Sequence, residues 1–333
     1  MLLIDALYIN NSGGMELLKY LVNSLEAIDC EVFYLFDDRC CSLFDVIDDR
    51  SCLFLKASIR NRYFFYRKNA NSFDKVLCFG NIPPPIKMNA CVYTYFHNIN
   101  LLNIPNRLPF ITRVLCFMKQ RYIASKKQNT DYWIAQTSNT KNEIGKVLHI
   151  PIDQILLYPF YQIEKGCGND IERNDYVYIA NYTPSKQHLF LVKAWRKLYQ
   201  LGYNLTLHLT LSNYPASLEN EIVQAMKERV KIVNHGNIDK DKVLSLYRKS
   251  KAIVYPSVNE SLGLGIIEAL SYGCDVIGPD LPYIHSVCVP SATFSLDSVD
   301  SLVESIITYE KKQSEHSKLL IYDTINELVK RLQ

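Results

Sequence analysis

Two glutamates, Glu260 and Glu268, stand eight positions apart in residues 256–268 (PSVNESLGLGIIE), around a turn that holds two glycines. The apolar pattern predicts a buried strand that ends at Tyr255 and a helix that opens near Gly265, with Glu268 in its first turn. Glycines let a backbone approach a ligand, and the first N–H groups of a helix bind anions. Two carboxylates beside such a site accept hydrogen bonds from hydroxyls. The pattern therefore predicts a ligand with both phosphate and sugar, whereas the alternative is a solvated loop acid and a glutamate that complements the helix dipole.

This segment, with GCDVI at 273–277, resembles the donor site of the family 4 (group 1) retaining glycosyltransferases, which have the GT-B fold. The signature of that family is two glutamates with seven residues between them, in the same flanking context. The resemblance implies that Glu268 binds the ribose of a nucleotide and that Glu260 contacts the donor sugar and orients its anomeric carbon. It also implies that Gly263, Leu264 and Gly265 form the phosphate-binding turn.

A second segment, residues 179–186 (IANYTPSK), is similar to the strand-to-helix phosphate loop of the same family. Lys186 occupies the position of the lysine that grips the donor pyrophosphate. Asn181 stands where arginine is usual, and this departure removes one positive charge from the expected donor site. The likeness extends to His235-Gly236 and 243–247, which are similar to the base-binding region of the family.

In the first half of the chain, residues 10–14 (NNSGG) link a predicted strand to its helix. Gly13 and Gly14 let a phosphate or an acceptor approach, and the family commonly has a Gly-Gly pair here, although such turns also occur for steric reasons. His97 follows another predicted buried strand. In related enzymes a histidine at such a strand end contacts the donor sugar or the acceptor, and the alternative is a satisfied structural histidine.

The resemblance implies transfer of a sugar with retention, in which Glu260, His97 and Lys186 are the candidate catalytic residues. The chemistry must stabilise a departing nucleoside diphosphate and a positive anomeric carbon, so it is electrostatic and positional. In the family, a donor phosphate oxygen is argued to take the proton of the acceptor. We expect a nucleotide-diphosphate sugar of UDP or GDP type as donor substrate, with no cofactor and no metal; Asp37-Asp38 and Asp48-Asp49 are predicted to be solvated or to cap helices.

The chain that must position these residues has 333 residues, more than one hydrophobic core usually serves. Short apolar runs alternate with amphipathic segments, which predicts an α/β protein with two doubly wound, Rossmann-like domains that face each other across a cleft. We expect an acceptor-binding domain at 1–163, a linker at 164–175 and a nucleotide-sugar domain at 164–313. Residues 314–332 are strongly periodic, which predicts a helix. We expect the C-terminal segment 314–333 to cross back to the first domain.

The pattern also predicts the elements of each domain. In the first domain, strands are expected at 2–8, 31–36, 53–57, 75–79, 90–96 and 132–136, with helices at 15–27 and 109–127 and a basic, aromatic stretch at 59–68. In the second domain, strands are expected at 176–180, 205–211, 230–234, 252–255 and 275–278, with helices at 188–201, 218–229, 240–249 and 265–271.

The net charge of +3 conceals an uneven distribution, because residues 50–130 contain fourteen Lys and Arg and a single acid, Asp74. Within this region, residues 56–68 and 109–127 interleave basic and aromatic side chains, which suits the surface of an anionic membrane. The alternatives are that the aromatic side chains belong to the core, that the region binds nucleic acid, or that the protein binds sugar nucleotides without catalysis.

Several observations bear on where the protein acts. No uncharged apolar stretch approaches the roughly 20 residues of a spanning helix, and the acid at Asp5 argues against a signal peptide. Ten cysteines without a Cys-x-x-Cys pair favour free thiols in a reducing compartment. We therefore predict a cytoplasmic enzyme, peripheral at the inner face of the membrane. Its acceptor is expected to be a saccharide carried on a lipid pyrophosphate, in the synthesis of an O-antigen or capsule, and nucleic acid is not an expected partner.

Overall fold

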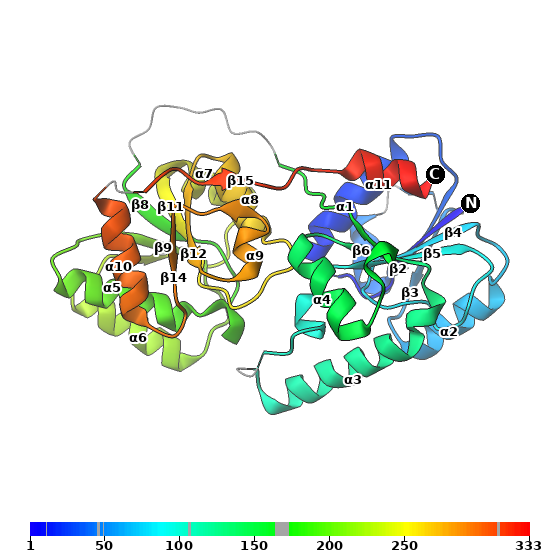
Figure 1. The fold of residues 1–333 in the computed structure, drawn as a ribbon, viewed down its shortest axis with the longest axis horizontal. Coiled ribbons are helices and arrows are strands. Elements are labelled where there is room, and N and C mark those ends of the chain that lie inside the picture. Colours follow the sequence, from blue (N-terminus) through cyan, green and yellow to red (C-terminus); the bar gives the residue numbers. More distant parts are fainter. Residues whose placement is uncertain (11, 45–46, 49, 106–107, 164–172, 312–313) are drawn as a thin grey trace. The chain divides into compact units, whose positions relative to one another are not determined.

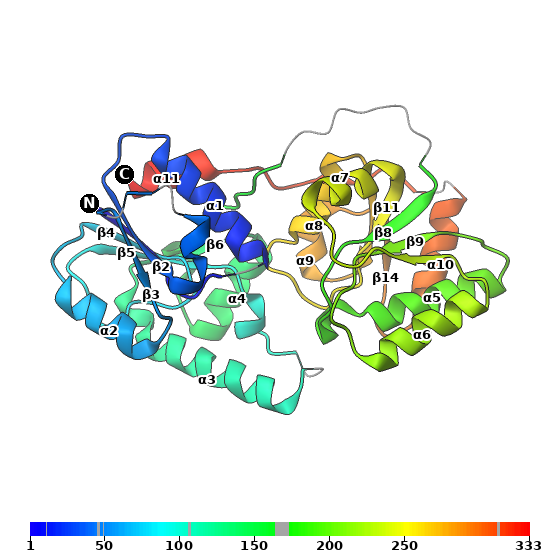
Figure 2. The same cartoon turned by 180° about the vertical axis from the view of Figure 1, so that it is seen from behind.

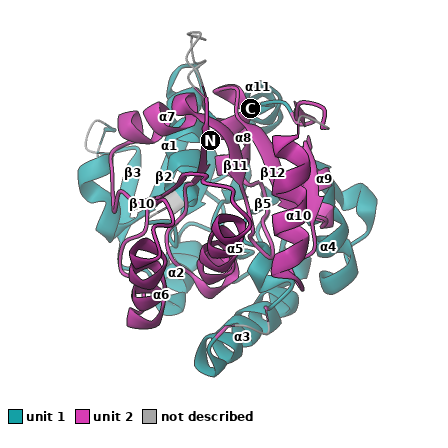
Figure 3. Cartoon of the chain, turned by 90° about the vertical axis from the view of Figure 1, so that its left-hand side faces the viewer, with its two compact units in different colours: residues 1–104, 109–162, 322–333 teal, residues 105–108, 163–321 magenta. Residues whose placement is uncertain are grey.

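The computed structural model describes residues 1–333 except 11, 45–46, 49, 106–107, 164–172 and 312–313 (Figures 1 and 2). The chain divides into two compact units, shown in two colours in Figure 3. Unit 1 holds residues 1–104, 109–162 and 322–333, and unit 2 holds residues 105–108 and 163–321. Of the predicted linker at 164–175, residues 164–172 lie outside the described residues. Asp175 is the first residue of a strand.

Unit 1 contains a seven-stranded parallel sheet with the strand order β3-β2-β1-β4-β5-β6-β7. Its strands are β1 (Leu2–Ala6), β2 (Val32–Asp37), β3 (Cys52–Leu55), β4 (Lys75–Cys78), β5 (Cys91–Phe96), β6 (Tyr132–Ala135) and β7 (Ile155–Leu157). Its helices are α1 (Ser12–Glu26), α2 (Ile59–Lys68), α3 (Phe110–Lys126), α4 (Ser138–Leu148) and α11 (Ile325–Leu332), with 3-10 turns η1 (Asp38–Leu43), η2 (Ile99–Leu101), η3 (Lys127–Asn129) and η4 (Ile152–Gln154). All five residues of β1 are buried, as expected for a strand covered on both faces.

Unit 2 contains a six-stranded sheet with the order β10-β9-β8-β11-β12-β14, and its strand pairs are parallel. The strands are β8 (Asp175–Tyr178), β9 (Leu207–Leu209), β10 (Ile232–Asn234), β11 (Ser250–Val254), β12 (Asp275–Pro279) and β14 (Ala292–Phe294), and a separate pair is formed by β13 (Cys288–Val289) and β15 (Lys318–Leu319). The helices are η5 (Pro184–Lys186), α5 (His188–Gln200), α6 (Ala216–Lys227), α7 (Lys240–Lys249), α8 (Leu264–Ser271), α9 (Pro282–His285) and α10 (Val299–Glu310). Two doubly wound Rossmann-like units are thus present, as predicted.

Each sheet has a point where the order of its strands reverses. In unit 1 it lies between β1 and β4, and in unit 2 it lies between β8 and β11. In doubly wound sheets ligands bind outside the carboxyl ends of the strands at such a switch point, because the two adjacent loops run to opposite faces and leave a crevice. The loops that follow β1 and β4, and those that follow β8 and β11, are therefore the places to look for sites.

The prediction of a continuous helix over 314–332 in the C-terminal segment is wrong. Lys318–Leu319 is strand β15, which pairs with β13 in unit 2, and the helix spans only Ile325–Leu332. The periodicity misled because Tyr322 is 75% exposed and does not belong to a buried face. The helix that does form buries residues 325, 328, 329 and 332, and it packs against α1 of unit 1 as the fold prediction stated.

The basic region of unit 1 is only partly a surface. In α2, Arg62 is 2% exposed and lies in the core with Phe65 and Tyr66, so its assignment to a basic surface is wrong. By contrast, α3 has a single buried residue, Ile123, and lies on the outside of the unit (Figures 1 and 2). None of the helices in the described ranges is long and apolar enough to cross a membrane.

Candidate functional site

Lys186 and Glu260 meet at the switch point of the second sheet. Lys186 ends η5, in the loop that follows β8, and Glu260 lies in the loop that follows β11. The Nζ of Lys186 pairs with Oε1 of Glu260, and the two side chains are 23% and 17% exposed. The two loops are also joined by the N–H of Val258, which donates to the carbonyl oxygen of Ser185 at 3.0 Å. The fold thus brings together two residues, 74 positions apart, that the sequence analysis assigned to one donor site.

Buried tyrosines form the floor beneath this ion pair. The Nζ of Lys186 lies 5.6 Å from the ring centroid of Tyr255, and the rings of Tyr255 and Tyr178 pack edge to face at 5.5 Å. Tyr283 donates a 2.6 Å hydrogen bond to a backbone carbonyl of the loop that carries Glu260. Burial, and next the charge of Glu260, raise the pKa of Tyr178, Tyr255 and Tyr283 well above the usual value. The floor is therefore neutral and places no second charge beneath the ion pair.

The turn into α8 has the predicted glycine geometry. Gly263 precedes the helix with a φ of +71°, and a Cβ added there would lie 3.0 Å from Ile266. Leu264 and Gly265 are the first two residues of α8, so their N–H groups belong to its N-terminus. Because α8 begins at Leu264, Glu268 is its fifth residue and lies in the second turn, which corrects the expected place in the first turn.

Glu268 contacts Tyr247, which ends the predicted base-binding segment 243–247, and Lys240, which lies outside every predicted motif. One of its carboxylate oxygens pairs with the Nζ of Lys240, and the other accepts a 3.5 Å hydrogen bond from the hydroxyl of Tyr247. Both partners lie on α7. The local pattern of residues 240–249 predicts a helix, but only the strand order brings that helix beside α8.

Asn181 is the predicted donor-site residue that joins neither ion pair. It follows β8 and is exposed, and among the described residues no hydrogen bond links it to Lys186, Glu260 or Glu268. Asn181 therefore does not supply the positive charge that an arginine would supply at this position. The cations beside the two glutamates are Lys186 and Lys240.

His97 and Gly14 meet at the switch point of the first sheet. A Cβ added to Gly14 would lie 3.0 Å from Cε1 of His97. The helix α1 begins at Ser12, so Gly13 and Gly14 lie in its first turn and not in the loop that was expected to precede it. The backbone N–H of His97 donates to the side-chain oxygen of Asn81 at 2.7 Å, and this asparagine adopts a φ of 67° just after β4.

The ring of His97 is buried and neutral near pH 7. Its Nε2 lies 3.0 Å from the carbonyl oxygen of Phe79, which accepts, and 3.2 Å from the side-chain Nδ2 of Asn81, which donates. Burial lowers the pKa of His97 to about 4. His97 can therefore exchange hydrogen bonds with an uncharged ligand near neutral pH, but it does not supply a positive charge.

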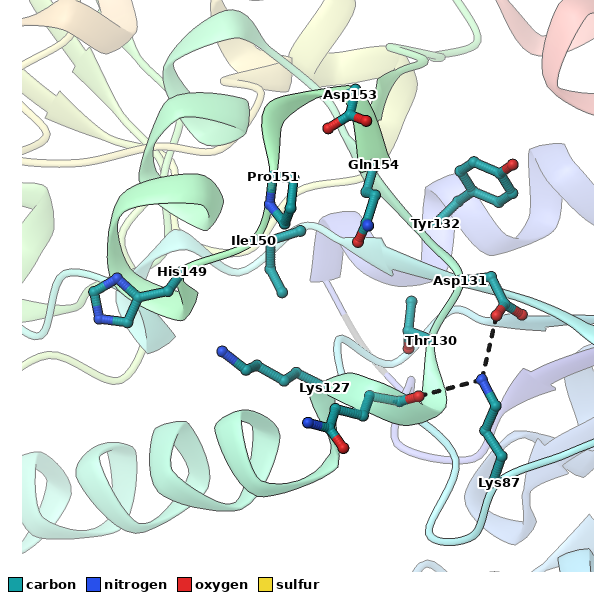
Figure 4. Close-up of a pocket in the computed structure, with 11 residues that line it drawn as sticks. Lys87, Lys127, Thr130, Asp131, Tyr132, His149, Ile150, Pro151, Asp153 and Gln154 are labelled. Carbon is teal, nitrogen blue, oxygen red and sulfur yellow. Dashed lines mark hydrogen bonds and ion pairs between the residues drawn. The ribbon is translucent and has the colours of Figure 1, made fainter.

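A hollow of about 690 Å³ in unit 1 lies at the other edge of the sheet (Figure 4). It opens around Asp131 and Tyr132, at the amino end of β6, whereas His97 follows the carboxyl end of β5. Lys87 donates to Asp131 at 3.3 Å, and Lys127 donates to the carbonyl oxygen of Leu148 at 2.9 Å. The lysines of this hollow already contact acceptors of the protein, and the arrangement does not suggest an anion site.

Two doubly wound parallel sheets in one chain are the architecture of the GT-B class of glycosyltransferase folds. Residues 163–325 match the sequence model of the family "Glycosyl transferases group 1". This part of the chain, which includes Lys186, Lys240, Glu260 and Glu268, is thus similar to that family.

The chain is also similar to individual glycosyltransferases. It is 26% identical over 156 residues to the O-antigen chain mannosyltransferase RfbU of Salmonella typhimurium, a match that covers 46% of this chain and 43% of the relative. The match thus spans less than half of that relative's length. The structure resembles the lipopolysaccharide outer core galactosyltransferase WaaB with a TM-score of 0.65, at 14% identity over 99% of this chain and 94% of the other. It also resembles HepE of Anabaena, solved with UDP and glucose, with a TM-score of 0.66 at 13% identity over 94% and 91% of the two chains. These low identities establish the fold alone.

Proposed function

We propose that this protein is a retaining glycosyltransferase that moves a sugar from a nucleoside-diphosphate donor to a saccharide acceptor without a metal ion. The observation that carries this proposal is the meeting of Lys186 and Glu260 at the switch point of unit 2, within the residues that match the group 1 family. The phosphates and the sugar of one ligand would both have partners at this pair. A lysine suits a phosphate, and a carboxylate suits a sugar hydroxyl.

Each part of the donor has a proposed partner in unit 2. Lys186 and the first N–H groups of α8, from Leu264 and Gly265, bind the diphosphate. Glu260 accepts hydrogen bonds from the donor sugar, and Glu268 accepts them from the ribose. Lys186 has three N–H donors and a carboxylate has about four acceptor sites, so the Lys186–Glu260 pair can persist while both residues contact the donor.

The reaction follows from these partners. Departure of the nucleoside diphosphate places negative charge on its phosphates, where Lys186 and the N-terminus of α8 stabilise it. The anomeric carbon becomes positive, and Glu260 stabilises that charge from the sugar side. A donor phosphate oxygen takes the proton of the acceptor hydroxyl, so that no side-chain base is required. His97 contributes a neutral hydrogen-bonding group to the sugar or the acceptor.

The expected acceptor is a saccharide on a lipid carrier, in the synthesis of a cell-surface polysaccharide at the inner face of the membrane. The functions of RfbU and WaaB, an O-antigen mannosyltransferase and an outer core galactosyltransferase, support this class of product. The donor is expected to be a UDP or GDP sugar, and HepE, whose structure holds UDP and glucose, supports a nucleotide of this type.

The exposed face of α3 supports a contact with an anionic membrane. Phe110 and Ile111 are 76% and 73% exposed, and the face continues over Val114, Leu115, Phe117 and Met118. Arg113, Lys119 and Arg121 are exposed on the same helix. A helix that is apolar on its solvent side and flanked by basic residues binds at the boundary between headgroups and acyl chains.

This membrane contact is tested by sedimentation with vesicles. We expect the chain to bind phosphatidylglycerol vesicles more tightly than phosphatidylcholine vesicles, and Phe110→Ser with Phe117→Ser to weaken that binding about tenfold. The matched control is Leu201→Ser with Met226→Ser in unit 2, where both replaced side chains are 54% exposed, as is Phe117. Equal losses in both double variants would contradict a specific role of α3.

The donor site is tested by calorimetry with UDP, GDP, ADP and TDP and with the matching nucleosides. We expect at least one nucleoside diphosphate to bind, and Lys186→Ala to weaken its binding about tenfold or more while the nucleoside binds as before. Lys193→Ala is the control, because Lys193 is exposed on the neighbouring helix α5. Absence of any nucleotide binding, together with tight and salt-sensitive DNA binding, would overturn the proposed function.

A further inference from the structure

The helix α7 contacts Glu268 through two residues of one face. Lys240 is the first residue of α7 and Tyr247 is seven positions further, so both side chains lie on the same side of the helix. Both α7 and α8 pack against β11 (Figures 1 and 2), which brings this side of α7 to Glu268. Lys240 pairs with Oε1 of Glu268, and the hydroxyl of Tyr247 donates to Oε2 at 3.5 Å. Both oxygens of one carboxylate are therefore held from a second helix.

The two partners of Glu268 have different physical characters. Tyr247 is fully buried, and burial, followed by the nearby charge of Glu268, raises its pKa well above the usual value, so it remains a hydrogen-bond donor. The Lys240 side chain is 58% exposed, whereas that of Glu268 is 17% exposed. An ion pair with so exposed a member contributes about 0–1 kcal/mol to folding, so fold stability alone does not account for it.

The carboxylate of Glu268 keeps acceptor capacity for a ligand with two neighbouring hydroxyls. Each carboxylate oxygen has two lone pairs, and each oxygen of Glu268 uses one of them toward α7. One acceptor site per oxygen remains, which matches the two O–H groups of a vicinal diol. Lys240 also neutralises the carboxylate, which would otherwise repel the phosphates of the same ligand.

We propose that Lys240 is a positioning residue which, with Tyr247, holds the ionised carboxylate of Glu268 toward the 2′- and 3′-hydroxyls of the donor ribose. This inference rests on the proposed function and adds to it a residue outside both donor motifs. Lys240 acts through Glu268, so its contribution depends on the ribose hydroxyls and not on the phosphates.

The test measures dissociation constants by calorimetry for the nucleoside diphosphate that binds the wild-type chain best and for its 2′,3′-dideoxy counterpart. We expect Lys240→Met to weaken binding of the ribonucleotide about tenfold and to leave binding of the dideoxy nucleotide within about twofold. Lys240→Arg, which keeps the charge, should restore most of the affinity. Lys242→Met is the matched control, since Lys242 lies on the same helix and pairs with Asp239 instead.

Each result has one meaning. Equal weakening of both nucleotides by Lys240→Met, or equal effects of Lys240→Met and Lys242→Met, would overturn the positioning role and indicate a general effect of charge. Unchanged binding of the ribonucleotide to Lys240→Met would overturn it as well. Failure of the wild-type chain to bind any nucleoside diphosphate would overturn the proposed function itself, and the inference with it.

Discussion

The two units share one architecture but place their charges differently. In unit 1 the switch point is neutral, with His97, Asn81 and Gly14, and the charged pair Asp5–Arg62 lies in the core with both side chains at most 3% exposed. In unit 2 the core at the switch point is neutral tyrosine, and the pair Lys186–Glu260 lies above it, partly exposed. The same fold thus uses an ion pair to hold itself together in one unit and, as we propose, to receive a ligand in the other.

The buried pair of unit 1 organises the loop after β4, which contains the asparagine that binds His97. The Nε of Arg62 donates to Asp5 at 2.7 Å, and its other nitrogens donate to the carbonyl oxygens of Ile82 and Pro83 at 2.9 and 2.7 Å. These carbonyls directly follow Asn81. Arg62 therefore fixes the backbone beside the asparagine that binds the N–H of His97.

The largest expected effect comes from Arg62→Met, which leaves Asp5 buried without its cation. We expect the free energy of unfolding of unit 1 to fall by about 3–5 kcal/mol, because loss of one partner strands a buried charge. Urea unfolding followed by circular dichroism measures this change. Arg60→Met is the control, because Arg60 is exposed on the same helix. A loss below about 1 kcal/mol would mean that the pair is not structural. If Arg62→Met lost nucleotide binding while unit 2 stayed folded, the Asp5–Arg62 pair of unit 1 would serve ligand binding as well as folding.

The opposite behaviour is expected of Glu260→Gln in unit 2. Turnover in a sugar-transfer assay should fall about 100- to 1000-fold, because a charge aimed at the developing positive centre is lost. The free energy of unfolding should change by less than about 1 kcal/mol, because the Lys186–Glu260 pair is partly exposed. Glu219→Gln, an exposed carboxylate on α6, is the matched control. Wild-type turnover of Glu260→Gln would remove Glu260 from the proposed mechanism.

Local pattern predicted most of the sheets because their strands are buried on both faces and read as short apolar runs. It marked 59–68 as a basic, aromatic stretch without assigning a helix, whereas this range is α2, which Ser58 caps by accepting from the N–H of Asn61. It failed for β13 and β15, which are two residues long and depend on each other across the chain. It also left α10 unpredicted, although its buried residues at 302, 303 and 306 have helical spacing.

For the candidate site, sequence could predict the residues whose spacing forms a motif. It could not predict Lys240, since its contact with Glu268 depends on which helices flank β11, a property of strand order. Arg62 did carry a signal, because it shares a helix face with Phe65 and Tyr66 at spacings of three and four, and Asp5 interrupts an apolar strand. The pairing of Asp5 with Arg62 could be predicted only if both side chains were first recognised as buried.

The smallest expected effect concerns the neutral side of the comparison, His97. Its pKa is about 4 in the folded chain, against about 6.5 when unfolded, so below pH 6.5 the unfolded state binds a proton that the folded state does not. The free energy of unfolding of unit 1 should therefore fall by up to about 1.4 kcal/mol per pH unit as the pH drops from about 6.5 toward 4. His97→Gln, which keeps an N–H group within reach of Phe79, should remove this part of the slope.

The control within unit 1 is His149→Asn, because His149 is exposed and asparagine tolerates its φ of 54°. Unit 2 supplies a second reference, since burial, reinforced by the charge of Lys186, also lowers the pKa of His188 to about 4. Unfolding in urea at pH 7.0 and pH 5.5 should then show a reduced slope for unit 1 alone in His97→Gln. An unchanged slope in this variant would mean that His97 is not held neutral at the switch point, and the contrast between a neutral first site and a charged second site would lose its basis.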